Sequence, residues 1–458
     1  MARAGVPITP GTAEPVTSPK AVAEFAAEHG YPVAVKASAG GGGKGFAVAR
    51  GEEEAGAAFE RASREGEAYF GDGAVYLEKY LPHPRHIEIQ VVCDRHGNAA
   101  HLGERDCSIQ RRHQKLVEEC PSPAMTPEMR ERMGAAAVAA ARAVGYDSVG
   151  TVEFLVQDEE FYFLEMNTRV QVEHPITEEV TGIDIVQTGI RIATGEPLPF
   201  AQEEIGWRGH AIEVRLNAED PASGFAPSPG MVTAYAEPGG PGVRVDSSLR
   251  GPGLVPESYD PLFAKLIVRG RDRRDALSRL RRALGEFRVE GIATTLPFFR
   301  AILDEESFLS GDYTTGYIAE RMGALRMEPA PAAGGAPPAR GEGRSLEVEV
   351  DGRLFRVRVF GELSGRGGAG VQAPPRRGGG GSRRASAVEG TVAAPMQGTI
   401  VKVLVREGQE VAADEPVCIL EAMKMESEIR TPKAGRVAKV AVGPGQAVRG
   451  GDPLVVVE

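Results

Sequence analysis

The chain has 458 residues, 42% hydrophobic and 26% charged, which is typical of a folded protein with roughly two to four domains of about 150 residues. Its net charge of -11 argues against nucleic acid as a partner, and no apolar run is long enough to cross a membrane. The four cysteines lack metal-binding spacing, and the N-terminus lacks the apolar core of a signal peptide. We therefore expect a reduced, cytoplasmic protein without a membrane partner.

The first 80 residues alternate between helical and extended patterns. Ser18-Pro19 is typical of a helix start, and Gly30 can end that helix. The pattern then predicts a strand over residues 31–38, a Gly-rich loop over 40–45 and a return strand over 46–50. A helix over 52–70 and a strand over 74–81 follow. The loop glycines let backbone N–H groups approach a phosphate, and Lys36 on the preceding strand could reach the same ligand. Lys44 is followed by glycine, so this is not a Walker A loop, and a surface hairpin is the alternative.

From residue 84 the pattern changes. Residues 86–93 alternate and predict a hairpin strand, Thr126 begins a helix that Gly145 can end, and two further strands follow over 150–157 and 161–167. The pattern predicts an α+β domain that ends near residue 323.

From Glu165, near the end of the strand predicted over 161–167, every second residue has a polar side chain, and these side chains are of several different kinds. These residues are Glu165, Asn167, Arg169, Gln171 and Glu173. In an extended chain they share one face. A turn at residues 157–160 can place Glu153 beside Glu165, and two carboxylates with an amide oxygen are ligands that Mg²⁺ prefers near nucleotide phosphates. Arg169 could then hold an oxyanion and Glu173 could act as a base; a solvated polar strand is the alternative.

A basic stretch lies between Glu104 and Lys115, in an otherwise acidic chain. Its positive charges suit a phosphate or bicarbonate site, although a basic surface is an equal alternative: Arg105, Arg111, Arg112 and Lys115. His86 and His113, taken singly, are more typical of structural than of catalytic histidines.

The C-terminal third begins with Ala/Pro/Gly-rich residues 324–344, which predict a linker. Residues 345–361 alternate around Asp351-Gly352 and predict a β-hairpin, and the Gly/Arg-rich residues 362–387 predict a flexible tether. GTIVKV from Gly398 matches GRVAKV from Gly435, and the residues that follow each also match. This repeat predicts a small pseudo-symmetric β-sandwich over 388–458, with Lys424, between Met423 and Met425, at an exposed hairpin tip.

Together these motifs resemble a known family. Residues 5–323 are similar to the lid and C-terminal parts of a biotin carboxylase, an ATP-grasp enzyme, in YPVAVKASAGGGGKG, LEKYLPHPRHIEIQV, GERDCSIQRRHQK, FLEMNTRVQVEHPITE and RGHAIEVRLNAEDP. Residues 390–458 resemble a biotinyl carrier domain with the attachment motif Glu-Ala-Met-Lys-Met. The implied fold is an α+β ATP-grasp unit, with a lid over 1–80 and an active-site domain over 81–323, followed by an all-β flattened sandwich of the biotinyl/lipoyl type.

The resemblance implies a role for each matching residue. The nucleotide contacts would be Lys36, Gly42, Gly43, Glu78, Lys79, Leu81, His86, Gln110 and His113. The metal ligands would be Glu153 and Glu165 with Asn167. The bicarbonate contacts would be Lys115, Arg169, Gln171 and the backbone of Val172. Glu173 would be the base that deprotonates bicarbonate, Arg215 would stabilise the biotin enolate, and Lys424 would carry biotin.

The implied reaction activates bicarbonate with ATP and Mg²⁺ (or Mn²⁺) through carboxyphosphate and then carboxylates biotin. The domain order resembles the α subunit of bacterial acetyl- or propionyl-CoA carboxylases, which implies two partners, a biotin protein ligase and a separate carboxyltransferase subunit. Biotin carboxylases begin with an α/β domain ahead of the segment at Ala4–Pro7, and we expect this domain to be absent from the chain. With that domain present, a homo-oligomer is expected; without it, we expect a weak or inactive carboxylase.

Other readings of the sequence remain open. Another ATP-grasp ligase would not need the fused Ala-Met-Lys-Met domain, and a non-catalytic biotin carrier with a carboxylase scaffold would lack bicarbonate-dependent ATP cleavage. Methionine on both sides of Lys424 favours biotin over lipoate. Pyruvate carboxylase is disfavoured, because the stretch between Gly323 and Val388 is too short for a TIM-barrel transferase of about 250 residues, so another polypeptide must handle the carboxyl acceptor.

Overall fold

The computed structural model describes residues 1–41, 44–327, 344–350, 353–359, 391–394, 398–422, 425–449 and 451–458. The expectations for Gly42, Gly43, Lys424, the tether over 362–387 and most of the linker fall outside these residues. Within them, no helix is both long enough and apolar enough to cross a membrane.

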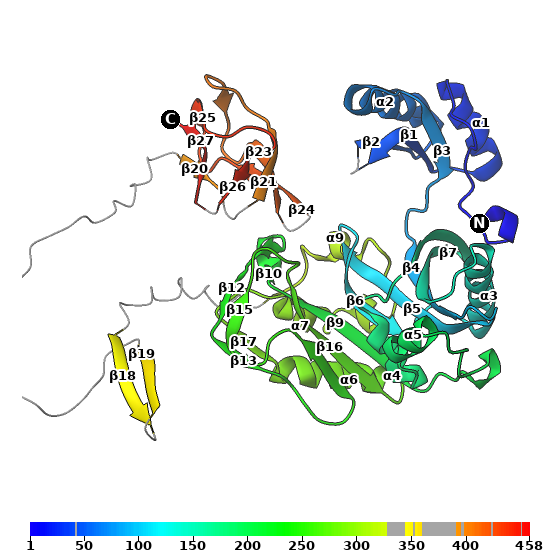
Figure 1. The fold of residues 1–458 in the computed structure, drawn as a ribbon. Helices are drawn as coiled ribbons and strands as arrows, with labels where there is room; N and C mark the ends of the chain where they lie inside the picture. The colour runs from blue at the N-terminus through cyan, green and yellow to red at the C-terminus, as the bar shows by residue number, and fades with distance from the viewer. Residues whose placement is uncertain are drawn as a thin grey trace, which may run out of the picture.

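Residues 9–80 contain a small three-stranded sheet with two helices on one face (Figure 1), whereas residues 1–8 pack against the following region, with Val6 in its core. The strands, in the order β2-β1-β3, are β1 (Val33–Gly41), β2 (Lys44–Ala49) and β3 (Val75–Lys79). The helices are α1 (Pro19–His29) and α2 (Glu52–Phe70), and a short 3-10 turn, η1 (Ala2–Ala4), precedes them. The predicted helix start at Ser18-Pro19 is confirmed, and Gly30 follows the last helical residue with a φ of 78° that favours glycine.

An eight-stranded sheet, in which every neighbouring pair is antiparallel, forms the centre of the following region. Its order is β14-β16-β9-β6-β5-β4-β7-β8. The strands are β4 (Arg85–Cys93), β5 (Ala99–Arg111), β6 (Gln114–Cys120), β7 (Val149–Gln157), β8 (Glu160–Asn167), β9 (His210–Asn217), β14 (Val243–Ser247) and β16 (Leu262–Gly270). Three small two-stranded pairs adjoin it: β10 (Glu219–Asp220) with β11 (Ala226–Pro227), β12 (Gly230–Val232) with β15 (Gly253–Val255), and β13 (Ala234–Ala236) with β17 (Arg288–Glu290).

Helices cover both faces of this sheet. They are α3 (Pro127–Ala143), α4 (His174–Thr181), α5 (Ile185–Ala193), α6 (Arg273–Glu286), α7 (Leu296–Ile302), α8 (Glu306–Ser310) and α9 (Tyr317–Arg321), with 3-10 turns η2 (Gln202–Glu204) and η3 (Pro221–Ser223). Alternate apolar residues of β4, such as Ile87 and Ile89, pack against α3, and the polar residues between them point to the other face. That polar face is also buried, partly beneath α4, so the alternation marks a functional face rather than a solvated one.

The polar array after Glu165 departs from the predicted strand. Strand β8 ends at Asn167, and the chain then turns until α4 begins at His174, with Glu173 as its N-cap at φ -82° and ψ 5°. Pro175 lies in the first turn of α4, where its fixed φ favours a helix start over a continued strand. Arg169, Gln171 and Glu173 therefore come from a loop and a helix start, and only Glu165 and Asn167 share a strand face.

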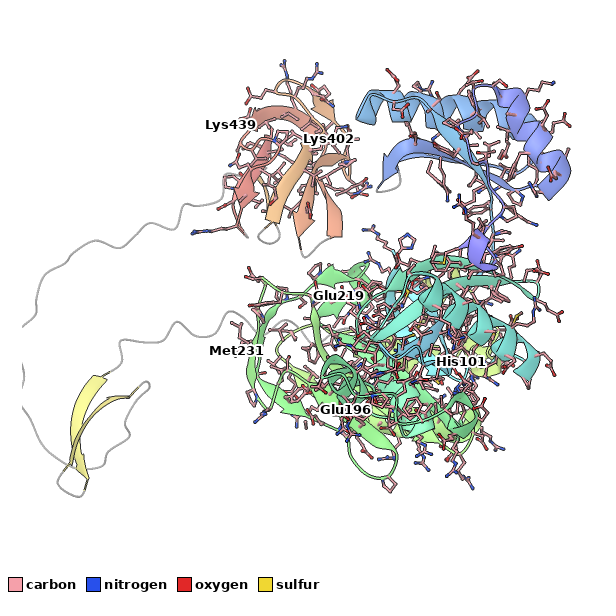
Figure 2. All side chains as sticks on the ribbon, turned by 45° about the vertical axis from the view of Figure 1, so that its right-hand side comes forward. His101, Glu196, Glu219, Met231, Lys402 and Lys439 are labelled. Carbon is pink, nitrogen blue, oxygen red and sulfur yellow. The ribbon has the colours of Figure 1, made fainter. Side chains whose placement is uncertain are left out.

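The C-terminal described residues form two four-stranded sheets, ordered β20-β27-β25-β22 and β24-β23-β21-β26. The strands are β20 (Thr391–Ala393), β21 (Gly398–Val403), β22 (Glu410–Val411), β23 (Pro416–Ala422), β24 (Met425–Arg430), β25 (Gly435–Val440), β26 (Ala447–Val448) and β27 (Pro453–Val457). The predicted repeat places Lys402 on β21 and Lys439 on β25, at equivalent positions of the two sheets (Figure 2). The two sheets have equivalent strand orders, which confirms the predicted pseudo-symmetric sandwich.

The predicted β-hairpin is also confirmed in its described parts. Strand β18 (Arg344–Val350) pairs antiparallel with β19 (Arg353–Val359), and the Asp351-Gly352 turn lies outside the described residues.

A buried carboxylate ties the C-terminal helices to the large sheet. Glu119 on β6 accepts hydrogen bonds from Nε and Nη2 of Arg273 on α6, at 2.7 and 2.8 Å. Tyr313 donates to it at 2.6 Å, and Nε2 of His210 lies 2.8 Å away. Although burial alone would raise it, the hydrogen bonds from Arg273 and His210 lower the pKa of Glu119 to about 2.

We predict that Glu119→Gln lowers the free energy of unfolding by about 3–5 kcal/mol at neutral pH, because Arg273 is left without its buried partner. The lowered pKa means that this carboxylate stabilises the fold above its ordinary pKa of 4.5 and loses that effect as the pH falls toward about 2. Denaturant unfolding between about pH 7 and 3 should show a shallower acid loss in the variant than in the parent chain. An equal acid dependence in both proteins would contradict the assignment.

Candidate active site

A cleft of about 700 Å³ opens beside strands β7 and β8 and the start of α4. Most of the residues predicted for the site line it: Leu81, His86, Gln110, His113, Lys115, Glu153, Glu165, Asn167, Arg169, Gln171, Val172, Glu173 and Arg215. A smaller cavity of about 110 Å³ is lined by Lys36, Glu78 and Lys79 and shares Tyr80 and Leu81 with the cleft. The structure therefore brings the predicted residues that it describes together in two cavities with a common wall.

The predicted pairing of two acids across the β7–β8 hairpin is confirmed. Glu153 and Glu165 are direct partners in the register of the two strands. Nδ2 of Asn167 donates to both acids, at 3.1 Å to Glu153 and 3.3 Å to Glu165. Two carboxylates side by side at a cleft fit a Mg²⁺ ion, which prefers oxygen ligands. Asn167 presents its amide nitrogen to the acids, so in this arrangement it orients them.

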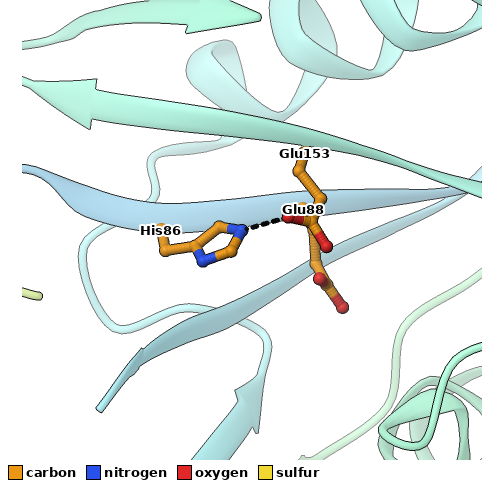
Figure 3. A group of neighbouring side chains, drawn as sticks. All are labelled: His86, Glu88 and Glu153. Carbon is orange, nitrogen blue, oxygen red and sulfur yellow. Dashed lines mark hydrogen bonds and ion pairs between the residues drawn. The ribbon is translucent and has the colours of Figure 1, made fainter. Parts of the chain in front are cut away.

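His86 supports Glu153 from within the sheet. Its Nε2 lies 2.7 Å from Oε2 of Glu153, and both side chains are buried (Figure 3). Glu88 on β4 lies beside them. One nitrogen of His86 and one carboxylate oxygen from each of Glu88 and Glu153 all lie within 4.8 Å of one another. Although burial opposes it, the contact with His86 and the charge of Lys115 lower the pKa of Glu153, so this acid is ionised at neutral pH.

Lys115 provides the cation for these acids. Its Nζ donates to Glu88 at 2.5 Å, to Glu153 at 2.9 Å and to Glu173 at 2.6 Å, so all three ammonium hydrogens are used. Burial would lower the pKa of Lys115, but the surrounding carboxylates outweigh it and raise that pKa. Although burial would raise it, the same ammonium charge and that of Arg105 lower the pKa of Glu88 to about 2. The ammonium group stays charged and joins the metal side of the cleft to Glu173.

Arg105 has a different place from the one that its sequence suggested. It is fully buried, and its five N–H groups donate to protein atoms of five residues: Glu88, Gln90, Thr151, Gln171 and Thr177. No donor is left for a phosphate or bicarbonate. The anion site was predicted from the positive charge of the basic stretch alone. In the structure only Lys115 of its four cations lies at the wall of the cleft, whereas Arg105 is buried in the sheet.

Arg215 on β9 reaches the cleft from below Glu173. Its Nε donates to Glu118 at 2.6 Å, and its Nη2 donates to Oε2 of Glu173 at 2.9 Å. Glu173 is thus held by two cations, with Lys115 on Oε1 and Arg215 on Oε2. Within the described residues Nη1 of Arg215 donates no hydrogen bond, so it can meet an anion in the cleft.

The loop between β8 and α4 supplies the remaining contacts. Gln171 donates to Glu153 at 2.7 Å, and the carbonyl of Val172 accepts from Lys265 at 2.8 Å. Arg169 is exposed and donates to Oδ1 of Asn167 at 3.1 Å, which keeps its guanidinium beside the paired acids.

The nucleotide residues predicted from the first 80 positions lie at the smaller cavity. Lys36 on β1 forms an ion pair with Glu78 on β3. Gln110 and His113 instead reach the large cleft from the hairpin between β5 and β6, whose two turn residues, Arg112 and His113, have φ values of 48° and 67°. Such φ values suit a two-residue hairpin turn but are rare for these residue types, so the sequence did not predict it.

Several buried polar residues escaped prediction. Glu88 and Gln90 alternate with apolar residues in HIEIQVVC, and this alternation was the signal that could have found them. Glu118 follows two apolar residues on β6 and Glu213 lies between two on β9, and a buried position had to be known before either stood out.

We predict that Arg105→Lys lowers the free energy of unfolding by about 3–5 kcal/mol, because lysine cannot supply five donors and leaves buried acceptors without partners. The exposed Arg208, replaced in the same way, is the matched control and should change stability by less than about 0.5 kcal/mol. Denaturant unfolding of both variants makes the measurement, and equal effects would show that the five contacts are not needed.

Three family models match consecutive parts of the chain. They describe the ATP binding domain of the carbamoyl-phosphate synthase L chain over residues 1–201, the biotin carboxylase C-terminal domain over 213–320, and the biotin-requiring enzyme family over 390–457.

Known proteins are similar over most of the chain. The biotin-dependent acyl-coenzyme A carboxylase alpha3 subunit of Mycobacterium leprae is 44% identical over 93% of this chain and 73% of its own length. A pyruvate carboxylase subunit of Methanothermobacter thermautotrophicus is 54% identical over 72% of this chain and 67% of its own length. The solved biotin carboxylase domain of a thermophilic 2-oxoglutarate carboxylase, bound to bicarbonate, has a TM-score of 0.66 and 46% identity over 70% of this chain and 71% of that one.

These matches agree with the paired acids, the cation-held glutamate and the repeated β-sandwich. The chain therefore belongs to the biotin carboxylase family of ATP-grasp ligases, which use ATP and Mg²⁺ to carboxylate biotin in the first half-reaction of biotin-dependent carboxylases, and it carries a biotinyl domain on the same polypeptide.

Proposed function

We propose that this chain carboxylates biotin held on its own Lys424, with the cleft residues in the roles given below. The observation that carries the proposal is the arrangement of Lys115, which joins the acid Glu153 on the metal side to the acid Glu173 on the far side. A site for phosphoryl transfer and a site for a base are thus held at a fixed separation.

On the metal side, Glu153 and Glu165 would hold Mg²⁺, which offsets negative charge on the phosphates of ATP. Asn167, through its amide oxygen, would be the third ligand. His86 and Lys115 keep Glu153 ionised, which a metal ligand requires. Lys36, Lys79, Glu78 and Leu81 would contact the nucleotide from the smaller cavity, and Gln110 and His113 from the cleft.

On the far side, Glu173 would take the proton of bicarbonate. Lys115 and Arg215 occupy one position on each of its oxygens, and a carboxylate has about four acceptor positions, so it can still receive a proton. Lys115, Arg169, Gln171 and the backbone of Val172 would bind the bicarbonate ion. Nη1 of Arg215 would face the negative charge that develops on biotin during carboxyl transfer.

Lys424 would carry biotin, whose ureido nitrogen supplies the atom that receives the carboxyl group. The described residues on either side, Ala422 and Met425, pair across strands β23 and β24. Lys424 belongs to the Ala-Met-Lys-Met motif between these strands, and a biotin protein ligase would modify it.

The final acceptor would be an acyl-CoA, handled by a separate carboxyltransferase subunit. Support comes from the Mycobacterium leprae relative, which matches 93% of this chain, including the biotinyl part. A second candidate is pyruvate, because a relative named as a pyruvate carboxylase subunit is 54% identical. The length argument against pyruvate carboxylase applies only to chains that contain the transferase, so it does not separate these acceptors.

We predict that Glu173→Gln lowers bicarbonate-dependent ATP cleavage by on the order of 10²–10⁴-fold, because the proton acceptor is lost. The KM for MgATP should change little, since Glu173 lies beyond the paired acids. The double variant Glu153→Gln, Glu165→Gln should instead raise the KM for MgATP, and ADP release measured against ATP and bicarbonate concentration separates the two effects.

The opposite pattern, with Glu173→Gln acting mainly on the KM for MgATP, would contradict the assignment of base and metal sides. Parental turnover in Glu173→Gln would remove that residue from its role.

We predict that co-expression with a biotin protein ligase adds one biotin to the chain and that Lys424→Arg prevents it. Arginine keeps the positive charge but cannot form the amide bond to biotin. Intact-mass measurement checks both proteins, and Lys402→Arg, a lysine on strand β21 of the same domain, is the control. A biotin retained in Lys424→Arg, or lipoate in its place, would overturn the assignment.

A further inference from the structure

Two buried glutamates beneath Arg215 have no part in the roles proposed above. Glu118 on β6 and Glu213 on β9 are direct partners in the antiparallel register, so their side chains leave the same face of the sheet. Both residues have no exposed surface. Helix α4 packs over this face with Ile176 and Val180, so water does not reach the two carboxyl groups.

The hydrogen bonds of this pair are incomplete. One oxygen of Glu118 accepts from Nε of Arg215 at 2.6 Å. The other oxygen of Glu118 and both oxygens of Glu213 have no partner among the described residues. Ionised carboxylates only accept hydrogen bonds, so two of them cannot satisfy each other, and buried acceptors without donors are costly. One proton placed on the pair would supply the missing donor.

The surrounding charges also leave the pair short of cations. The charged or titratable groups that face it are Arg215 on β9, Lys115 on β6, Cys107 on β5, Lys265 on β16 and Glu173 at the start of α4. Lys115 is already engaged by three other carboxylates, and Lys265 by the Val172 carbonyl and Asp246. Arg215 alone contacts the pair, and it divides its charge between Glu118 and Glu173.

The pKa shifts of the two glutamates agree with this shortage of nearby cations. Burial raises the pKa of Glu118 to about 7, against the opposing charge of Arg215. Burial and the neighbouring Glu118 raise the pKa of Glu213 well above its usual range.

We propose that Glu118 and Glu213 share one proton at neutral pH, with Glu213 as the neutral member, and that they form a positioning pair for Arg215. The pair then presents a single negative charge to the inner side of the guanidinium. Arg215 is held between that charge and Glu173, with Nη1 toward the cleft. A second ionised carboxyl below would draw the guanidinium inward and weaken its contact with Glu173. This effect on Arg215 rests on the function proposed above, whereas the shared proton does not.

Infrared spectroscopy of the full chain tests the proton directly, because a protonated carboxyl has its C=O stretch at a higher frequency than a carboxylate. We expect a band of a buried protonated carboxyl at neutral pH in the parent chain and its loss in Glu213→Gln. Glu203→Gln, at an exposed glutamate, is the matched control and should keep the band. A band that survives in Glu213→Gln would overturn the proposal.

Glu118→Gln gives a second test that holds even where Glu213→Gln fails to fold. Glu213 stays buried in this variant, but its proton loses the carboxylate that shares it, so the protonated-carboxyl band should shift in frequency. A band at an unchanged frequency would overturn the shared proton.

Activity tests the positioning role. We expect Glu118→Gln to lower kcat for biotin carboxylation by about 10²-fold, the scale of a misplaced catalytic contact, with the KM for MgATP unchanged. The parent chain should also lose rate as the pH falls through about 7, when the pair gains a second proton, and Glu118→Gln should lack this acid limb. Identical pH profiles would reduce the pair to a structural role. A chain without any bicarbonate-dependent turnover would instead contradict the proposed function, and the infrared result would still decide the shared proton.

Discussion

The candidate site depends on one buried ammonium group, that of Lys115. It contacts three carboxylates, which come from β4, β7 and the start of α4. Glu88 and Glu173 each contact an arginine as well, whereas Glu153 has only His86 as a further ion-pair partner among the described residues. Removing one member of a buried ion pair is strongly destabilising, so loss of this lysine would weigh most on Glu153. The metal side and the base side of the cleft therefore cannot move independently while the ion pairs hold.

The large sheet makes this arrangement feasible because its central strands are buried on both faces. One face of β4 packs its isoleucines against α3, and the other supplies His86, Glu88 and Gln90 to the polar network. Neighbouring strands β4, β5 and β6 follow one another along the chain, and β7 and β8 form the next hairpin. Most of the site is thus built by local antiparallel pairing, with α4 and β9 added from later in the chain.

What the sequence could predict follows from how local each feature is. The pairing of Glu153 with Glu165 needed only two strands and the turn between them, and the repeat of the biotinyl domain was visible as matched residues. The loop over residues 168–172 was not predicted, because alternation of polar residues looks the same whether or not a strand continues. The buried places of Arg105, Glu118 and Glu213 depend on which strands become neighbours and on the helix that covers them, and no local pattern contains that information.

The hydrogen bonds around Arg105 also have a direction. A guanidinium has no acceptor, so both amides that it contacts, Gln90 and Gln171, must turn their oxygens toward it and their nitrogens away. The nitrogen of Gln171 then points at Glu153, and that of Gln90 at the carbonyl of Gly150. The orientation of an amide at the cleft wall is therefore dictated by a side chain that never meets the substrate. Hydrolysis of the Gln171 amide during ageing of the protein would reverse this polarity, because a carboxylate there could still accept from Arg105 but would oppose Glu153.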